Sequence, residues 1–262
     1  MNGRRIGLVM FGLIALIALA GPLLAPHDPA RTIGLPFDAP GGHALLGTDF
    51  LGRDVLSRAL AGGWSVLAYA GLATLLAYAV GLPIGLAAGY TRSWLDSVLM
   101  RGVDVLIAFP ALVFVLLVAT GLGRGIVPVV LATAIIQVPA IARIIRAATA
   151  EQSVRGYVEA AVVRGESSVS VLRREVLPNI ARPIAADIGL RSTWSVLLIA
   201  GVNFLGLGMQ PPAADWGLMV SENRAGMDLD LNPLSVLIPA IMLGVLTVAI
   251  NLISDALAGG KR

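Results

Sequence analysis

The sequence contains no cysteine and very few charged residues. Of its 262 residues, 13% are charged, 57% are hydrophobic and none is cysteine. The absence of cysteine excludes disulfide bonds and metal sites built from thiolates. A soluble domain typically carries roughly 25% charged residues, about twice the proportion found here. The composition therefore predicts a protein that places most of its surface in a membrane.

Lysine and histidine are also scarce, which limits the chemistry open to the chain. The only lysine is Lys261, so the lysine that holds the phosphates in a Gly-x-x-x-x-Gly-Lys-Ser/Thr loop is absent. His27 and His43 have Asp28 and Asp49 nearby, but this spacing favours a solvated loop over a metal site. We expect no catalytic residue, no bound metal and no cofactor on this chain, and no binding of nucleic acid.

Six apolar runs have about the length that a helix needs to cross a bilayer, roughly 20 residues. They are Ile6–Leu24, Trp64–Tyr90, Gly102–Leu122, Ile126–Ala142, Ile184–Leu207 and Leu234–Ile253. The first run also resembles a signal peptide with a small-residue site at Ala18-Leu19-Ala20, but its continuation to Leu24 favours a membrane helix. We expect a first transmembrane helix at 1–24, an extracytoplasmic loop at 25–63, a core of five helices at 64–257 and a tail at 258–262.

The distribution of positive charge predicts how these helices are oriented. With the N-terminus in the cytoplasm, thirteen lysines and arginines lie on the inner side and five on the outer side. Cytoplasmic loops carry an excess of these residues, so both termini are expected in the cytoplasm. The same orientation places a long polar interval, residues 143–183, on the cytoplasmic side between the fourth and fifth runs.

A few residues inside the runs stand out. Gly81, Gly85 and Gly89 recur every four residues, which permits close helix packing and favours contacts within the chain over a subunit interface. Asp187 and Arg191 are four residues apart, so they are expected to form a structural ion pair on one face of the fifth span. No row of acids or histidines crosses the midplane, which argues against a proton-coupled carrier.

The polar interval has the periodicity of two short helices. The first has an apolar stripe made of Val154, Tyr157, Val158, Ala161 and Val162. Gly165 then allows a turn, Ser167 and Ser168 can cap a second helix, and Pro178 is expected to stop it. The second helix would be striped by Val169, Leu172 and Val176. Periodicity alone supports equally a hairpin folded back on the bundle and a helix offered to a partner's groove.

Residues 159–179, EAAVVRGESSVSVLRREVLPN, resemble the EAA loop of ABC importer permeases. Three further segments resemble the dipeptide, oligopeptide and nickel subfamily of these permeases, specifically its C-type subunit. They are LGTDFLGRDVLSR (46–58), RSWLDSVLMRGVDVLIAFP (92–110) and NFLGLGMQPPAADWG (203–217). The chain departs from the subfamily pattern at Glu166 and Glu175, and both departures add negative charge to the loop.

The resemblance implies an all-α, MetI-like permease fold of six transmembrane helices in the bacterial plasma (inner) membrane. It implies a coupling helix that docks on an ATPase, with docking and coupling assigned to Tyr157, Val158, Glu159, Ala160, Ala161 and Gly165. The implied partners are a second permease chain, two ATPase subunits that use ATP and Mg²⁺, an extracytoplasmic binding protein and membrane lipid. The implied function is ATP-driven import of di- or oligopeptides by alternating access. Nickel-chelate or haem import, and an ion-coupled carrier, are the alternatives.

On the outer side, we expect residues 25–63 and 208–233 to receive the binding protein. The second segment contains Asp215, Trp216 and Glu222, and its acidic residues, which also include Asp228 and Asp230, outnumber the single Arg224. Such a bias steers a basic patch on a partner. A solvated loop without a partner explains the same residues equally well.

Overall fold

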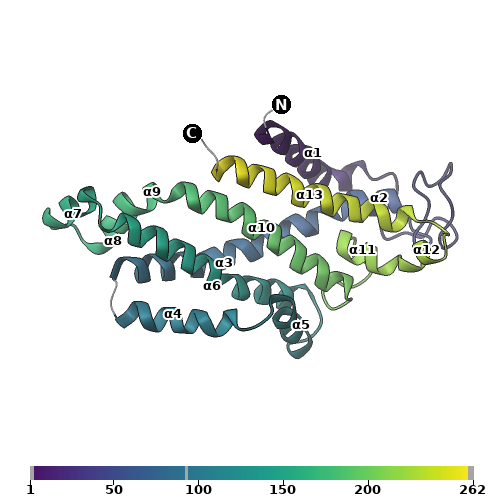
Figure 1. Ribbon diagram of the computed structural model, residues 1–262. Coiled ribbons are helices and arrows are strands. Elements are labelled where there is room, and N and C mark those ends of the chain that lie inside the picture. Colours follow the sequence, from purple (N-terminus) through teal and green to yellow (C-terminus); the bar gives the residue numbers. More distant parts are fainter. Residues whose placement is uncertain (1–2, 92–93, 259–262) are drawn as a thin grey trace.

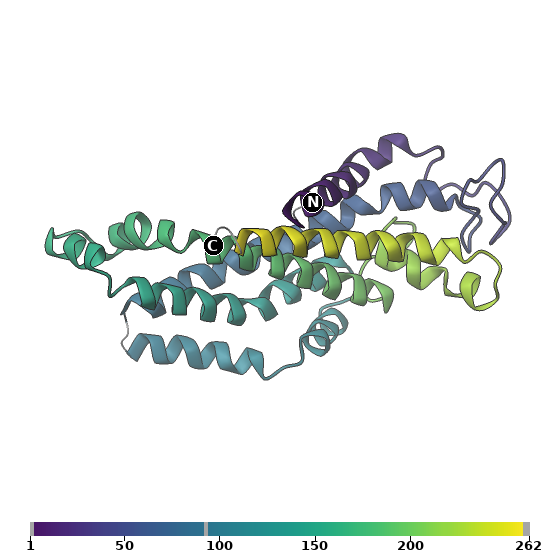
Figure 2. The same cartoon turned by 45° about the horizontal axis from the view of Figure 1, so that its top comes forward.

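The long helices of the chain lie side by side in a single elongated bundle (Figure 1). The structure is a computed structural model that describes residues 3–91 and 94–258. Arg92 and residues 259–262 of the expected C-terminal tail lie outside the described residues. Two short helical regions extend from opposite ends of the bundle, one formed by α7 and α8 and the other by α11 and α12 (Figures 1 and 2).

The helices divide into long ones that build the bundle and short ones that lie at its ends. The long helices are α1 (Gly3–Leu24), α3 (Gly63–Thr91), α4 (Trp94–Ile107), α5 (Ala111–Gly121), α6 (Ile126–Gln152), α10 (Ala181–Phe204) and α13 (Leu234–Ala258). The short helices are α2 (Val55–Ala61), α7 (Gly156–Val163), α8 (Ser168–Val171), the π-helix η1 (Leu172–Val176), α9 (Leu177–Asn179), α11 (Trp216–Glu222) and α12 (Arg224–Asp228).

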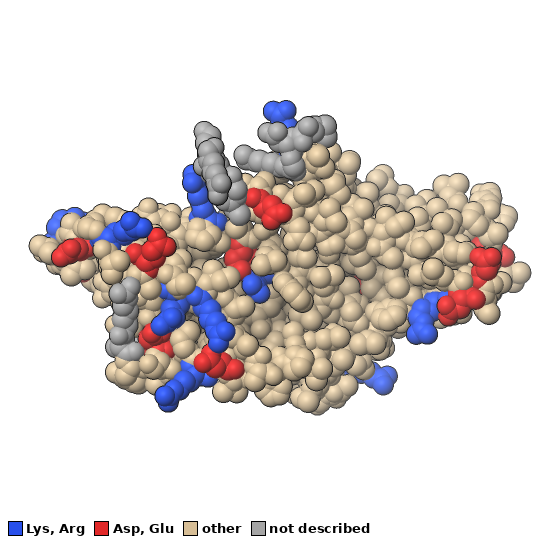
Figure 3. Space-filling view, viewed as in Figure 1, with Lys and Arg blue, Asp and Glu red and all other residues tan. Residues whose placement is uncertain are grey.

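Most of the long helices are apolar enough to cross a membrane. Within the described residues, five helices pass this test of length and composition, and a bent pair can supply a sixth. Large apolar side chains such as Leu13, Leu75 and Ile241 are exposed along the bundle, where a soluble protein would carry polar residues. Charged side chains gather toward the α7 end and, in smaller number, at the opposite end, with broad uncharged surface between them (Figure 3). This arrangement suits a bilayer around the middle of the bundle.

The tightest contact of the bundle joins α3 to α6 and depends on three glycines. A Cβ atom added at Gly85 would lie 2.6 Å from Ile145 Cβ and 2.7 Å from the Ala142 carbonyl oxygen. Added Cβ atoms at Gly81 and Gly89 would meet α6 just as closely. The repeat therefore lets two backbones approach within this chain, as small residues do in membrane helices.

The third predicted span, Gly102–Leu122, is wrong as a single helix. The structure places α4 and α5 there, bent by 82° from one another. Pro110 precedes α5, and a residue before proline is pushed out of the helical region, so α4 ends at Ile107. The other spans lie where the apolar runs predict them, although α6 continues ten residues past the predicted end at Ala142, to Gln152. The expected outer loop at 25–63 also ends in a helix, α2.

Candidate functional site

The insert between α6 and α10 projects beyond the ends of the long helices (Figure 2). It contains α7, a turn at Gly165, and then α8, η1 and α9 in direct succession. Gly165 has a φ of 81°, in the left-handed region that glycine adopts without strain. The side chain of Ser167 caps α8 by accepting a hydrogen bond from the Ser170 amide. The insert is thus an ordered helical hairpin, with its turn at the predicted glycine.

One narrow face of α7 holds the insert against the bundle. Val158 and Ala161 are 2% and 0% exposed and belong to a core cluster that includes Ile145 of α6 and Ile180 at the start of α10. Val171 and Val176, from the second half of the hairpin, join the same cluster. Because Val158 and Ala161 face inward, they anchor α7 and leave no surface for a partner. Of the residues assigned to docking and coupling, these two are therefore buried against the bundle, where their side chains are not exposed to a partner.

Away from this buried face, the hairpin exposes several apolar side chains, which we call the α7 patch. Its members are valines and a tyrosine that are 37–81% exposed: Val154, Tyr157, Val162, Val163 and Val169. Of the five residues predicted to form the apolar stripe of the first helix, only Val158 and Ala161 are buried. Val154 lies outside α7, which begins at Gly156, and two residues are enough to bury one side of an eight-residue helix. Val169, which was predicted to be buried in the second helix, is exposed, and Val171 is buried in its place. Exposed apolar residues gathered at a polar end of a membrane protein mark a contact surface.

Charged residues surround the α7 patch. Glu159 and Ala160 are exposed on α7. Arg155 donates a hydrogen bond to Glu151 at 2.9 Å, and Arg164 donates one to Glu166 at 2.7 Å across the turn. The hydrogen bonds from Arg164 and Ser170 hold the pKa of Glu166 below its usual range. The carboxylate that departs from the subfamily pattern therefore helps to close the turn.

Pro178 does not end the helical path, contrary to the sequence prediction. The widened turn of η1 precedes it, and Pro178 lies in the first turn of α9. Proline is tolerated there because its missing N–H would have no partner within the helix. The chain then enters α10 after Ile180, so the second half of the hairpin is continuous with a long helix.

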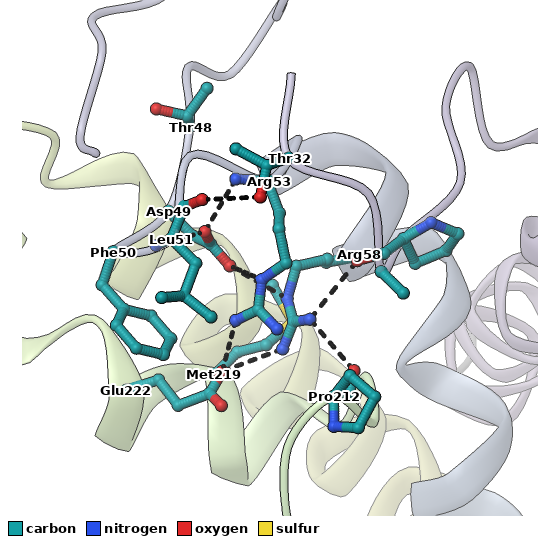
Figure 4. Close-up of polar contacts among 12 residues, drawn as sticks. Thr32, Thr48, Asp49, Phe50, Leu51, Arg53, Arg58, Pro212, Met219 and Glu222 are labelled. Atoms are coloured by element: carbon teal, nitrogen blue, oxygen red, sulfur yellow. Dashed lines mark hydrogen bonds and ion pairs between the residues drawn. The ribbon is translucent and has the colours of Figure 1, made fainter. Parts of the chain in front are cut away.

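At the other end of the bundle, four charged residues form what we call the outer ion cluster (Figure 4). They are Asp49, Arg53, Arg58 and Glu222. Asp49 Oδ2 lies 2.7 Å from Arg53 Nε and 3.2 Å from Arg58 Nε. Glu222 Oε2 accepts from both arginines, at 3.1 Å and 2.8 Å. All four side chains are at most 7% exposed, and their two positive and two negative charges balance.

The cluster is part of a wider contact between two distant segments of the chain. Arg58 also donates to the carbonyl oxygens of Pro212 and Ala213, at 3.3 Å and 3.2 Å. Trp216 Nε1 donates to the Ala59 carbonyl oxygen at 2.7 Å. Residues 46–58 and 203–217, two of the segments that resemble the permease subfamily, therefore pack together as one unit.

Asp215, Trp216 and Glu222 were expected to face a partner protein, and the structure corrects this. Asp215 and Trp216 are 0% exposed, and the Glu222 side chain is 7% exposed. Asp215 caps α11 and accepts hydrogen bonds from Ser65, Asn203, Gly217 and Leu218. Burial nonetheless raises its pKa above the usual range. Asp228 and Asp230 are the acids of this segment that remain exposed.

Two sets of polar side chains lie within the bundle itself. Arg191 donates to Asp187 at 3.1 Å, which is the contact expected from their spacing, and Tyr78 also donates to Asp187 at 2.6 Å. The second set joins α3, α6 and α10: the Ser195 hydroxyl lies 2.8 Å from Thr74 Oγ1 and accepts from Gln137 at 2.8 Å. Sequence reasoning missed this set because its members are uncharged and distant in sequence.

The described residues contain no group of three or more histidine, cysteine or acidic side chains placed to hold a metal ion. His27 instead lies 3.2 Å from Asp54, and its backbone amide donates to the hydroxyl of Ser57. Asp54 and Ser57 also bond one another at the start of α2. These contacts tie the outer segment 25–54 to the bundle.

A bundle of apolar helices with charged residues gathered toward its two ends defines a multi-pass membrane protein. Comparison with known families gives the class. Residues 81–260 match the family described as "Binding-protein-dependent transport system inner membrane component", and residues 4–40 match "N-terminal TM domain of oligopeptide transport permease C". The chain belongs to this family of inner-membrane permeases.

Individual relatives agree with this assignment. The chain is 35% identical over 253 residues to the glutathione transport system permease protein GsiD of Pectobacterium atrosepticum, covering 96% of this chain and 83% of the relative. It is 35% identical over 247 residues to GsiD of Escherichia coli O157:H7, covering 94% and 81%. The chain is therefore a permease component of the dipeptide and oligopeptide type of ABC importer, in which ATP hydrolysis belongs to separate subunits.

Solved structures confirm the fold. Two inward-facing crystal forms of the MetNI methionine ABC transporter superpose with TM-scores of 0.56 and 0.58. Their sequences are 17% and 16% identical, and the matches cover 76% and 78% of this chain and 94% and 97% of the other. At such low identity the likeness shows the MetI-like permease fold alone.

Proposed function

We propose that this chain is one of two permease subunits that import short peptides by alternating access, driven by two ATPase subunits, one of which docks on the α7 patch. The observation that carries the proposal is the α7 patch itself, an exposed apolar surface on a hairpin that is anchored to the bundle. The positive-charge bias of the sequence supports a cytoplasmic position for this end, with both termini on the same side.

The anchoring explains how a docked ATPase would act on the membrane helices. ATP can shift the transporter between two states only if it favours one of them. Val158 and Ala161 join α7 to Ile145 of α6 and to Ile180 at the entrance of α10. A movement imposed on the α7 patch is therefore passed to two long helices through packed side chains.

The docking role can be tested by placing a charge in the patch. Val163 is 81% exposed, so Val163→Asp leaves the core of the chain intact. We expect this variant to lose copurification of the ATPase subunits while its thermal unfolding stays unchanged. Leu35, 72% exposed at the opposite end, provides the matched control, and Leu35→Asp should retain the ATPase. Retention of the ATPase by Val163→Asp would contradict docking at this patch.

Coupling, as distinct from docking, is proposed to depend on Glu159 and Gly165. Gly165→Leu places a branched side chain at a φ of 81°, which strains the turn by roughly 1–2 kcal/mol. Glu159→Ala removes an exposed charge beside the patch. We expect both complexes to assemble but to show reduced peptide uptake and reduced substrate-stimulated ATPase activity. Wild-type coupling in both variants would exclude this role.

At the opposite end, we propose that the exposed tip of α12 receives an extracytoplasmic binding protein. Asp228 and Asp230 are exposed there beside Leu229 and Leu231. Asp228→Asn with Asp230→Asn removes two negative charges, and asparagine tolerates the positive φ of residue 230. If these acids steer a basic partner, the association rate should fall at low salt and be little changed at high salt. An unchanged rate at low salt would refute steering.

Short peptides are the favoured substrate class because the relatives named above are glutathione permeases, and glutathione is a tripeptide. Nickel chelates and haem are the alternatives within the same machinery. Identification of the ligand carried by the binding protein that copurifies with this chain would decide among them. Uptake that persists without ATP and follows an ion gradient would instead indicate a secondary carrier.

A further inference from the structure

Among the described residues, two apolar grooves lie between the long helices, and one of them is followed by a hollow that contains two arginines. The first, which we call the α4 groove, encloses about 540 Å³ between α3, α4 and α6. Its walls are apolar and are formed by side chains such as Leu76, Val98, Leu106, Leu131 and Val138. The second, between α1, α3, α10 and α13, encloses about 330 Å³ and is lined by apolar and small residues with two serines.

Toward the α7 end, two of the three helices that form the α4 groove, α4 and α6, line a polar hollow of about 450 Å³. Its lining contains Asp96, Ser97 and Met100 from α4, and Arg143 and Arg146 from α6. Val98 and Leu99 of the groove lie between these α4 residues, and Val138 precedes Arg143 by little more than one helical turn. The groove and the hollow therefore follow one another along a single helix pair.

The arginines of the hollow are only partly neutralised. Arg146 makes two hydrogen bonds of 2.6 Å to the Asp96 carboxylate, and Arg143 donates to Asp104 through one nitrogen, Nη2. Their side chains remain 43% and 51% exposed. Arg101 of α4 is also exposed, outside the lining of the hollow. An anion at the mouth of the groove thus meets the accessible guanidinium edges of Arg143 and Arg146.

We propose that the α4 groove holds an anionic glycerophospholipid, with an acyl chain along the apolar walls and the phosphate at Arg143 and Arg146. The apolar lining of the groove suits an acyl chain, which has no polar group to satisfy. Basic pockets between membrane helices suit anionic headgroups, and arginine binds phosphate with two parallel hydrogen bonds. The second groove shares Ser254 with a polar hollow whose lining holds one arginine, Arg182, and two acids, Asp187 and Asp255, so we expect it to favour anionic headgroups less.

The ion pair of Arg143 with Asp104 provides a matched pair of variants. Arg143→Gln and Asp104→Asn break the same contact between α4 and α6, but only the first removes positive charge. The test uses the assembled transporter in detergent with added 1-palmitoyl-2-oleoyl phosphatidylglycerol or phosphatidylcholine, and native mass spectrometry measures the lipid retained. Both lipids have the same acyl chains, so a difference between them reports on the headgroup alone.

We expect the wild-type complex to retain phosphatidylglycerol in preference to phosphatidylcholine. Arg143→Gln should lower phosphatidylglycerol retention by about fivefold, the effect of one cationic side chain near an anionic lipid, and leave phosphatidylcholine unchanged. Asp104→Asn should keep or raise phosphatidylglycerol retention. Arg143→Lys preserves the charge, so its lipid retention should resemble that of the wild type. If Arg143→Gln fails to fold, Arg143→Lys is the variant that is measured.

Three results would overturn the proposal. The first is equal retention of the two lipids by the wild type. The second is an equal loss of phosphatidylglycerol retention in Arg143→Gln and Asp104→Asn, which would show that Arg143 acts only through its contact with α4. The third is efficient cross-linking of a cysteine placed at Val98 to the second permease chain, which would show that a protein fills the groove. This chain has no native cysteine, so the introduced one is its only thiol.

Discussion

Removal of one charge from the outer ion cluster should destabilise the whole outer end of the protein. Glu222→Gln keeps the shape of the side chain but leaves two buried arginines with a single carboxylate, Asp49. Breaking a buried ion pair by removal of one partner typically costs about 3–5 kcal/mol. For a chain of this size, that corresponds to a fall in melting temperature on the order of 10 °C. Thermal unfolding of the purified complex measures the change.

Charge balance gives this prediction a second, stricter test. Arg53→Met combined with Glu222→Gln removes one charge of each sign and leaves the pair of Arg58 and Asp49, 3.2 Å apart. We expect the double variant to be more stable than the sum of the two single losses by about 0.5–3 kcal/mol. Asp228→Asn, at an exposed acid nearby, controls for simple loss of a negative charge. A melting temperature for Glu222→Gln equal to that of Asp228→Asn, or strict additivity in the double variant, would refute the reasoning.

Further predictions concern the interior of the bundle. Gly85→Ala should lower stability by about 1–3 kcal/mol, because its Cβ would lie 2.7 Å from a carbonyl oxygen of α6. Gly71→Ala in the same helix has no heavy atom within 4 Å of the added Cβ, and its melting temperature should stay the same or rise. Asp187→Ala should destabilise by about 3–5 kcal/mol, since it strips both Tyr78 and Arg191 of their shared acceptor. If the melting temperature of Asp187→Ala equals that of the wild type, Asp187 has no structural role.

The features that could be predicted from the sequence are those whose signal is local. A continuous apolar run fixes most of a membrane helix, and the four-residue spacing of Asp187 and Arg191 puts them on one face. The turn at Gly165 follows in the same way from one residue type. The break at Pro110 carries a local signal too, but the apolar run continues through it and conceals the bend.

The features that could not be predicted depend on contacts between distant residues. Arg58 and Glu222 are 164 positions apart, so nothing near Glu222 shows that its charge is already matched. An acidic loop therefore looked like a steering surface, although its innermost acids are buried. The burial of Val158 and Ala161 could not be predicted for the same reason. The apolar residues that cover them come from α6 and from the residue before α10, which are outside α7 in the sequence.

The close fit of α3 on α6 has a mechanical consequence for any movement of this protein. An α-helix rises 1.5 Å per residue, and a slide of even that size would drive the backbone at Gly81, Gly85 and Gly89 against α6 side chains that already lie in contact with it. We therefore expect the two helices to move together. Because the α7 hairpin packs in the same cluster as Ile145 of α6, we expect a displacement of the hairpin to tilt α3 and α6 together and to leave their register unchanged.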